Sequence, residues 1–393
     1  MISRAALLIV MVALGIALGA VQFIPLFEAA SGNFRSDSAS FQQVLDWAHP
    51  PRDVIQFLMP NFYGSPAQHG YVDVFANQYV DLTAQNITSL AGNRLTTITW
   101  DMKNYVEAAL YVGILPLVLA AFGLIASLTP QPPLRTERGS RVGTPYMASE
   151  IKNGRDVSRP YDSAIGSSSV YRLTFAILAA FSLTVMFGLP TYALLYYTLP
   201  GISQLHSPFR WVFALTLCVA VLAGFGLDDL LAGVASKWAR RIGIGLLGLG
   251  VVIGAGLLLS RAIYPQIEPT LERLWRGLAH APEAFSDTRM FYSVTFVNVL
   301  VFAVMLAGAG AVFVFASRNL TPQPPLQVER GSRAQRDGGE VPGFLAVALI
   351  ALDLMIASWG FNPASDPAWL DFTPPAITWL QEQPGDWRYT TYD

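Results

Sequence analysis

The chain has 393 residues, of which 53% are hydrophobic and only 13% are Asp, Glu, Lys or Arg. Soluble domains carry roughly 25% charged residues, so this chain has too little polar surface to cover a soluble globule of its size. The net charge of −2 and the pI near 6.1 provide no basic surface for nucleic acid. A single cysteine, Cys218, excludes an internal disulfide, and the four scattered histidines form no zinc motif. The composition therefore indicates an integral membrane protein.

Apolar runs along the chain predict the membrane spans. A bilayer core about 30 Å thick requires about 20 apolar residues per helix. The first run is longer than the apolar region of a signal peptide and no small-residue cleavage pattern follows it closely, so we expect a retained helix. The predicted fold is an all-α integral membrane protein, a bundle of about seven transmembrane helices with large outer loops and disordered cytoplasmic insertions. The predicted spans are 5–24, 108–128, 173–189, 211–227, 242–260, 291–316 and 343–359.

The distribution of Lys and Arg predicts the orientation, because basic residues are retained on the cytoplasmic side in short loops. With the N-terminus inside, the inner segments hold 15 of the 25 basic residues, although loop 261–290 contributes four Arg against this trend. We therefore expect a multi-pass protein of a bacterial cytoplasmic membrane, with the N-terminus inside and the C-terminus outside. The inner segments are then 1–4, 129–172, 232–241 and 317–342.

The spans and loops suggest a division of the chain into segments. Residues 1–128 hold two helices joined by a large outer loop, 25–104, whose Pro, Gly and Asn residues predict ordered turns and a short helix. Residues 173–316 hold four helices, and residues 343–393 hold the last helix and the start of a truncated outer domain. Within the four-helix segment, three prolines predict a re-entrant or interfacial hairpin at 190–210. The outer loop 261–290 contains a predicted amphipathic helix at 269–278.

Two nearly identical Pro-rich stretches occur in the cytoplasmic loops. Residues 128–141 and 320–333 agree at twelve of fourteen positions, whereas their flanks are unrelated. Such a pair is typical of an inserted element rather than of an architectural repeat. A paired binding motif for a partner that recognises proline is the alternative. The composition predicts disordered insertions at 129–172 and 317–342.

Ionisable residues inside or beside the apolar runs require an explanation, because burying a charge in hydrocarbon is costly. Asp353 lies near the middle of the last run. It is either a proton or ligand group, or a bundle-facing carboxylate bonded to a neighbouring hydroxyl or backbone group. Asp228 and Asp229 are expected at the inner interface, paired with Lys237 or Arg240.

The outer loops contain candidate catalytic carboxylates. Glycosyl transfer at this face would need a carboxylate that removes the acceptor's proton, or one that holds a divalent cation such as Mg²⁺ or Mn²⁺ against the leaving phosphate. The first outer loop offers five such residues, Asp46, Asp53, Asp73, Asp81 and Asp101, and no pair of them has a diagnostic spacing. Of these, we select Asp46, Asp53 and Asp73 as the catalytic candidates. Each of them alone is equally typical of a turn or cap residue.

Residues suited to bind a substrate lie in the same loops. Arg210 stands in a Pro-rich segment just before an apolar run, where its guanidinium could grip a lipid phosphate or simply anchor the interface. His206 lies four residues earlier. The aromatic rings of Tyr63 and Trp100 could stack on sugar rings.

An ordered set of fragments resembles the YfhO family of bacterial multi-spanning membrane proteins. The resemblance covers the chain except for the two Pro-rich insertions, and the order of the fragments carries it rather than any one of them. The family tends to carry an Arg where His206 stands here, which leaves Arg210 as the better match. The fragments are Val21-Gln22-Phe23-Ile24-Pro25, Leu58-Met59-Pro60-Asn61-Phe62-Tyr63-Gly64, Tyr111-Val112-Gly113-Ile114-Leu115-Pro116, Leu199-Pro200-Gly201, Ser207-Pro208-Phe209-Arg210, Leu222-Ala223-Gly224-Phe225-Gly226-Leu227 and Thr373-Pro374-Pro375-Ala376.

The resemblance implies a function. The YfhO family is similar to the GT-C class of glycosyltransferases, so we expect transfer of a sugar from a polyprenyl-phosphate donor to a cell-envelope glycopolymer or lipid at the outer membrane face. The family has further spans before the position where this chain begins, and its acidic motif has no counterpart here. The resemblance thus implies an internal fragment, inactive alone unless an adjacent chain supplies the missing N-terminal spans. A flippase or transporter of lipid-linked sugars, and a non-catalytic membrane scaffold, are the alternatives.

Overall fold

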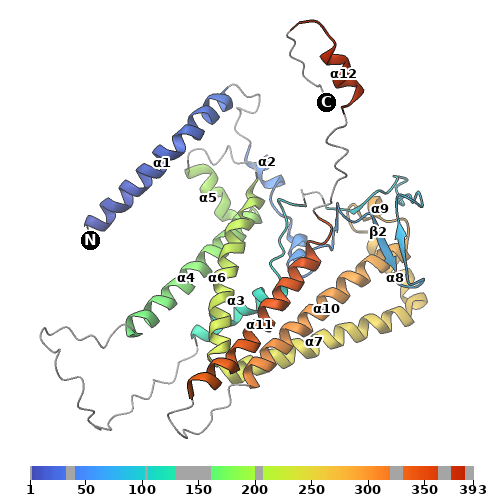
Figure 1. The fold of residues 1–393 in the computed structure, drawn as a ribbon. Helices are drawn as coiled ribbons and strands as arrows, with labels where there is room; N and C mark the ends of the chain where they lie inside the picture. Colours follow the sequence, from blue (N-terminus) through green and yellow to red (C-terminus); the bar gives the residue numbers. More distant parts are fainter. Residues whose placement is uncertain are drawn as a thin grey trace, which may run out of the picture.

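A computed structural model gives the fold of residues 2–31, 40–101, 105–128, 161–199, 207–318, 331–361 and 373–385 (Figure 1). The described chain is mostly helical, as expected. Four of its helices are long and apolar enough to cross a membrane: α4 (Tyr161–Met186), α6 (Val212–Leu231, preceded by the 3₁₀ turn η3, Pro208–Trp211), α7 (Ser236–Ala262) and α10 (Thr288–Arg318).

The other three predicted spans are also helical, but their apolar parts are shorter. They are α1 (Ile2–Ser31), α3 (Ile114–Leu128) and α11 (Gly331–Ala357). The predicted start of the second span at residue 108 is wrong, because Gly113 takes a left-handed φ of 91° and the helix begins only after it. At 1.5 Å per residue, the 15 residues of α3 extend about 22 Å, which is less than a bilayer core.

The helices of the bundle alternate in direction between two ends. We call the end where α4, α7 and α11 begin the base, and the opposite end the head end. At the head end, the backbone N–H of His49 donates to the carbonyl of Met186 (2.9 Å), near the end of α4. There, too, the end of α7 meets the start of α10, where the hydroxyls of Ser260 and Tyr292 lie 2.8 Å apart. The three loops predicted to be cytoplasmic all join helices at the base.

Small residues allow two helix pairs to approach closely. Helix α7 packs along α10 (Figure 1), and a side chain at Gly243, Gly250 or Gly310 would overlap the backbone of the facing helix. Helix α3 packs along α6, where Gly123 faces Gly226 across the interface. Close backbone contact between membrane helices depends on such residues, because lipid provides no hydrophobic force that would press helices together.

Residues 40–101 and 261–287 fold together at the head end, and we call them the head subdomain. As predicted, the first of these segments is broken by turns. It contains α2 (Phe41–Asp46), the 3₁₀ helix η1 (Pro51–Phe57), and two small antiparallel pairs: β1 (Gly64–Ser65) with β4 (Ile98–Thr99), and β2 (Gly70–Asp73) with β3 (Gln78–Asp81).

The second segment of the head subdomain holds α8 (Tyr264–Arg276) and α9 (Ala281–Ala284). The helix predicted at 269–278 is thus present, although it begins earlier. Trp275 on its apolar face is fully buried in a core with Leu82, Ile98 and Trp100, and its indole N–H donates to the Thr288 hydroxyl (3.0 Å). Its apolar face therefore covers protein.

Two further expectations need correction or fall partly outside the described residues. Helices α4 and α11 begin at Tyr161 and Gly331, inside the segments predicted to be disordered, because extending an existing helix costs little compared with nucleating one. Residues 129–160 and 319–330, with most of the Pro-rich repeats, lie outside the described residues.

In the predicted hairpin at 190–210, Pro190–Thr198 form α5, which packs on Phe41 of α2, and residues 200–206 are outside the described residues.

Candidate functional site

Two adjoining cavities open at the head end, where residues of both the bundle and the head subdomain line them. The larger has a volume of about 580 Å³ and lies between the β2–β3 hairpin, α10 and the end of α11. The smaller, of about 270 Å³, lies beside η1 and the segment 105–111. Pro60 and Tyr111 line both cavities, so the two are neighbours. Their volumes approach or fall within the range of small-molecule sites.

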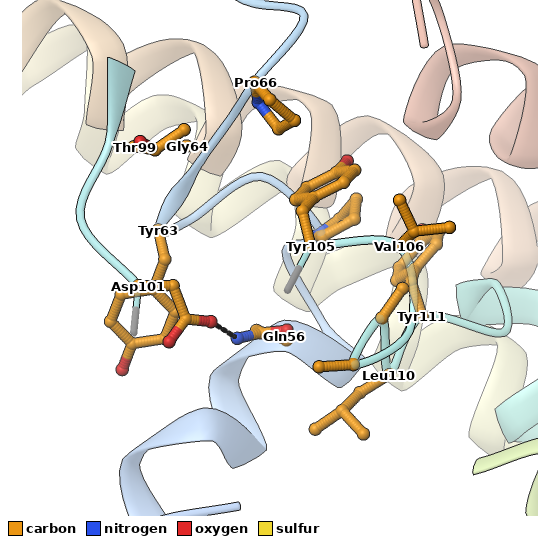
Figure 2. A pocket seen from close by; sticks show the side chains of 13 residues that line it. Gln56, Tyr63, Gly64, Pro66, Thr99, Asp101, Tyr105, Val106, Leu110 and Tyr111 are labelled. Carbon is orange, nitrogen blue, oxygen red and sulfur yellow. Dashed lines mark hydrogen bonds between the residues drawn. The ribbon is translucent and has the colours of Figure 1, made fainter. Parts of the chain in front are cut away.

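The carboxylate of Asp101 and the phenols of Tyr63, Tyr105 and Tyr111 line the smaller cavity (Figure 2). Asp101 Oδ2 accepts a hydrogen bond of 2.8 Å from Gln56 Nε2. The hydroxyl of Tyr63 donates to the carbonyl of Arg52 (3.1 Å), and the hydroxyl of Tyr105 donates to Asn61 Oδ1 (2.6 Å). Burial raises the pKa of Tyr63 to about 12, and the negative charge of nearby Asp53 acts in the same direction. Burial also raises the pKa of Tyr105. Both phenols therefore remain protonated donors at neutral pH.

The larger cavity holds the second carboxylate, Asp353. Asp353 is 2% exposed and bonds to two groups of the loop before α3: the hydroxyl of Tyr111 donates to Oδ1 (2.5 Å), and the backbone N–H of Ile114 donates to Oδ2 (2.9 Å). A carboxylate at this place stabilises the unsatisfied N–H groups at the start of a helix. The structure thus shows the second of the two predicted roles for Asp353, a bundle-facing carboxylate held by a hydroxyl and the backbone.

The three aspartates predicted to be catalytic lie on three separate elements and line neither cavity. Asp46 ends α2, where its carboxylate accepts from Gln42 (3.0 Å). Asp53 in η1 is fully buried beside His49, whose Nδ1 lies 2.8 Å from Asp53 Oδ2.

Asp73 lies at the turn of the β2–β3 hairpin. Its Oδ1 accepts from the backbone N–H groups of Phe75 (2.8 Å) and Ala76 (3.1 Å), and Arg289 lies 2.8 Å from Oδ2. Burial opposes the charged form, but these donors and the guanidinium together hold the pKa of Asp73 below its ordinary value. Its contacts are those of a residue that closes a turn and fastens it to α10.

The residues predicted to bind substrate are distributed as follows. Arg210 projects from η3, and its Nη2 lies 2.9 Å and 3.0 Å from the two carboxylate oxygens of Glu107, which precedes α3. Trp100 is 4% exposed and packs against the ring of Tyr63 at 4.7 Å between centroids, so its faces are covered by protein. Tyr63 itself lines the smaller cavity. His206 lies outside the described residues.

A further acidic residue has a partner that the sequence did not indicate. Asp229 pairs with Arg172 of α4, which also donates to the carbonyl of Gly123 (3.0 Å), so the predicted pairing with Lys237 or Arg240 is wrong. Two features hid this partner in the sequence. Arg172 lies 57 residues from Asp229 along the chain, and it falls in a segment expected to be disordered. Asp228 is exposed at the base, as expected.

The same separation hid Asp101 and Tyr111 as cavity residues. The sequence signals for this region were Tyr63, the aspartates of the outer loop, and Asp353 as a carboxylate inside an apolar run. Among the described residues, no three His, Cys, Asp or Glu side chains come together as a metal site.

Comparisons with known proteins add nothing to this picture, because no family model, curated protein or solved structure matches the chain significantly.

Proposed function

We propose that the chain is part of a membrane glycosyltransferase of the GT-C type, which moves a sugar from a polyprenyl-phosphate donor to a cell-envelope glycopolymer or lipid. One observation carries the proposal: two adjoining cavities, each with a carboxylate, lie where the apolar bundle meets the polar head subdomain. A donor with a lipid tail and a sugar headgroup needs a site at such a boundary. The fragment resemblance to the YfhO family supports the same proposal.

The proposal places seven helices in a bacterial cytoplasmic membrane, with the head subdomain outside, the N-terminus inside and the C-terminus outside. The gathering of the predicted inner loops at the base supports this orientation, because these loops hold most of the basic residues. Helices α1, α3 and α11 would then cross with short apolar segments. An adjacent membrane chain that contributes further spans is the expected partner.

Asp101 is the carboxylate best placed for the chemistry, since it lines a cavity and Gln56 fixes one of its oxygens. In the proposed step, a hydroxyl oxygen of the acceptor attacks the anomeric carbon of the donor sugar. The bond from that carbon to the phosphate oxygen breaks, and the phosphate leaves with the electron pair. The hydroxyl proton passes to Asp101, which acts as the general base. The hydroxyl protons of Tyr63 and Tyr105 already go to Arg52 and Asn61, so their oxygens would accept hydrogen bonds from the sugar hydroxyls.

Arg210 is the proposed ligand of the donor phosphate, which would compete with the Glu107 carboxylate for its guanidinium. Arginine suits this task because its guanidinium can make two parallel hydrogen bonds to phosphate. Asp46, Asp53 and Asp73 as catalytic groups, and His206 as a second phosphate ligand, stay predictions. A divalent cation such as Mg²⁺ or Mn²⁺ against the leaving phosphate also stays a prediction.

The experiment compares membrane vesicles that contain the parent chain, Asp101→Asn, or the control Asp228→Asn at an exposed position of the base. Sugar transfer from a radiolabelled polyprenyl-phosphate sugar is measured. General-base catalysis typically contributes 10²–10⁴-fold, so we expect transfer to fall about a hundredfold in D101N and to remain near the parent rate in D228N. Full activity in D101N would overturn the assignment of Asp101.

The same vesicles distinguish the other functions. Movement of the labelled lipid across the bilayer without transfer to any acceptor would indicate a flippase. Absence of both transfer and movement, with the adjacent chain present, would indicate a scaffold.

A further inference from the structure

The larger cavity has two walls of opposite character. One wall comes from the head subdomain and is polar, with Asn61, Gln68 and His69 among its residues. The other comes from α10 and α11 and is mainly apolar, with Val297, Val301 and Ile356 among its residues, although Asn298 and Asp353 also lie on it. A ligand that fills this space must therefore join a polar group to a hydrocarbon chain.

The polar wall presents acceptors that need donors. Gln68 lines the cavity, but its Oε1 is covered by protein and has no hydrogen-bond donor among the described residues, which is costly. A turn of the amide toward the cavity would let a ligand supply that donor. His69 Nδ1 lies 3.0 Å from the carbonyl of Thr96, so this nitrogen carries the proton and Nε2 is left as an acceptor in the neutral ring. On the facing wall, the Asp353 carboxylate of α11 also lines the cavity; each of its oxygens already accepts one hydrogen bond, from Tyr111 or Ile114, and can accept a second. A hydroxyl-rich ligand matches such a wall.

The described lining residues also argue against a phosphate in this cavity. Not one of them is Lys or Arg, and the only carboxylate among them is that of Asp353. A phosphate there would meet a negative charge without a cation to balance it, because tight phosphate sites use Arg, Lys or clustered backbone N–H groups. The phosphate of the donor must therefore sit elsewhere.

We propose that the larger cavity binds an uncharged glycolipid, with the sugar hydroxyls against Gln68 and Asp353 and the acyl chains along α10 and α11. The inference rests on the proposed function and assigns this cavity to the acceptor side of the reaction. The smaller cavity, with Asp101, then lies next to it across Tyr111. The sugar of the glycolipid would reach the general base from the larger cavity.

Binding tests the inference independently of transfer. The whole chain in lipid nanodiscs is titrated with monoglucosyl dioleoylglycerol, with dioleoylglycerol, and with dioleoyl phosphatidic acid, and bound lipid is counted by native mass spectrometry. We expect the glucosyl lipid to bind at least tenfold more tightly than either comparator. Equal or tighter binding of phosphatidic acid would overturn the assignment to an uncharged headgroup. Equal binding of dioleoylglycerol would overturn the role of the sugar.

Matched variants locate the site. Val297→Trp fills the apolar wall, whereas Val304→Trp places the same ring on the same helix at a residue that is 56% exposed and does not line the cavity. We expect at least a tenfold loss of glucosyl lipid binding in V297W and little change in V304W. Equal effects of the two variants would contradict the site. Gln68→Leu removes the unpaired acceptor, and a loss of about fivefold to tenfold is expected, against little change in Gln85→Leu at an exposed position of the head subdomain.

The two proposals can fail separately. Selective glucosyl lipid binding without sugar transfer would overturn the proposed function and leave the glycolipid site in place. Transfer that V297W does not slow, together with no selective binding, would overturn the glycolipid site alone.

Discussion

The two ends of the bundle satisfy their polar groups in different ways. At the base, Arg172 and Asp229 form an ion pair. The guanidinium of Arg172 also donates a hydrogen bond to the carbonyl of Gly123, and its Cζ lies 5.0 Å from the centroid of the Phe225 ring. At the head end, carboxylates line cavities, and three buried atoms have no hydrogen-bond partner among the described residues: Gln68 Oε1, His49 Nε2 and Asp53 Oδ1, although Arg52 Nε lies 3.8 Å from the last. Buried polar groups are normally satisfied. Arg172 Nε at the base also lacks a hydrogen-bond partner among the described residues, so unpaired groups alone do not separate the two ends. The cavities do separate them: the head end, where carboxylates line two cavities, is the better candidate for ligand binding, and the base is the better candidate for holding the helices together.

The largest expected effect concerns the ion pair at the base. Asp229→Ala leaves the Arg172 guanidinium without its main partner, and breaking a buried pair costs about 3 kcal/mol or more. Thermal unfolding of the purified chain in detergent measures the loss. Asp228→Ala is the matched control, because Asp228 is the neighbouring residue and is exposed. Similar thermal unfolding midpoints for D229A and D228A would show that the ion pair between Arg172 and Asp229 does not stabilise the packing of the helices at the base.

Helix contact near the base gives the next largest effect. A side chain at Gly226 would overlap the carbonyl of Leu119 on α3, whereas one at Gly224 meets nothing within 4 Å. Overpacking of this kind costs about 1–3 kcal/mol, so Gly226→Ala should lower the unfolding temperature clearly. Gly224→Ala should leave it unchanged or raise it slightly, because alanine favours the helix. The comparison fails if both variants unfold alike.

A smaller effect is expected at the head end from Asp73. Because its pKa is lowered in the folded chain, the carboxylate contributes stability above its unfolded pKa, and that contribution is lost as the pH falls through the folded value. Asp73→Asn should cost about 1 kcal/mol at pH 7 and less in strong acid, as measured by unfolding at a series of pH values. The variant Asp81→Asn in the same hairpin is the control. A constant difference between D73N and parent at all pH values would contradict the assigned contacts.

The smallest effect on stability is expected at Glu107 and Arg210. Their side chains are 39% and 57% exposed, and exposed ion pairs contribute about 0–1 kcal/mol. Glu107→Gln should therefore barely change unfolding, but it frees Arg210 and should lower the KM for the polyprenyl-phosphate donor. Arg210→Ala should raise that KM. An unchanged KM in both variants would separate Arg210 from the donor phosphate.

The sequence predicted the helical fold and the existence of an ordered loop at the head, because apolar runs and turn residues are local signals. It did not predict the partners of Asp229 or the cavity position of Asp101. These depend on contacts between residues far apart in the chain, such as Tyr111 with Asp353. Aromatic residues misled in one respect: Trp100 looked suited to stack on a sugar, yet it packs against Tyr63 within a core that Trp275 of α8 helps to form. Composition alone does not separate a ring that packs inside from one that faces a ligand.

Hydrogen–deuterium exchange tests the central claim most directly, which is that the head end binds the ligand and the base does not. The whole chain in nanodiscs is compared with and without a polyprenyl phosphosugar and monoglucosyl dioleoylglycerol. The account predicts added protection in peptides covering 56–71 and 105–111, which line the cavities, and no change in peptides covering 236–243 and 312–318 at the base. Protection confined to the base, or spread equally over both ends, would contradict it.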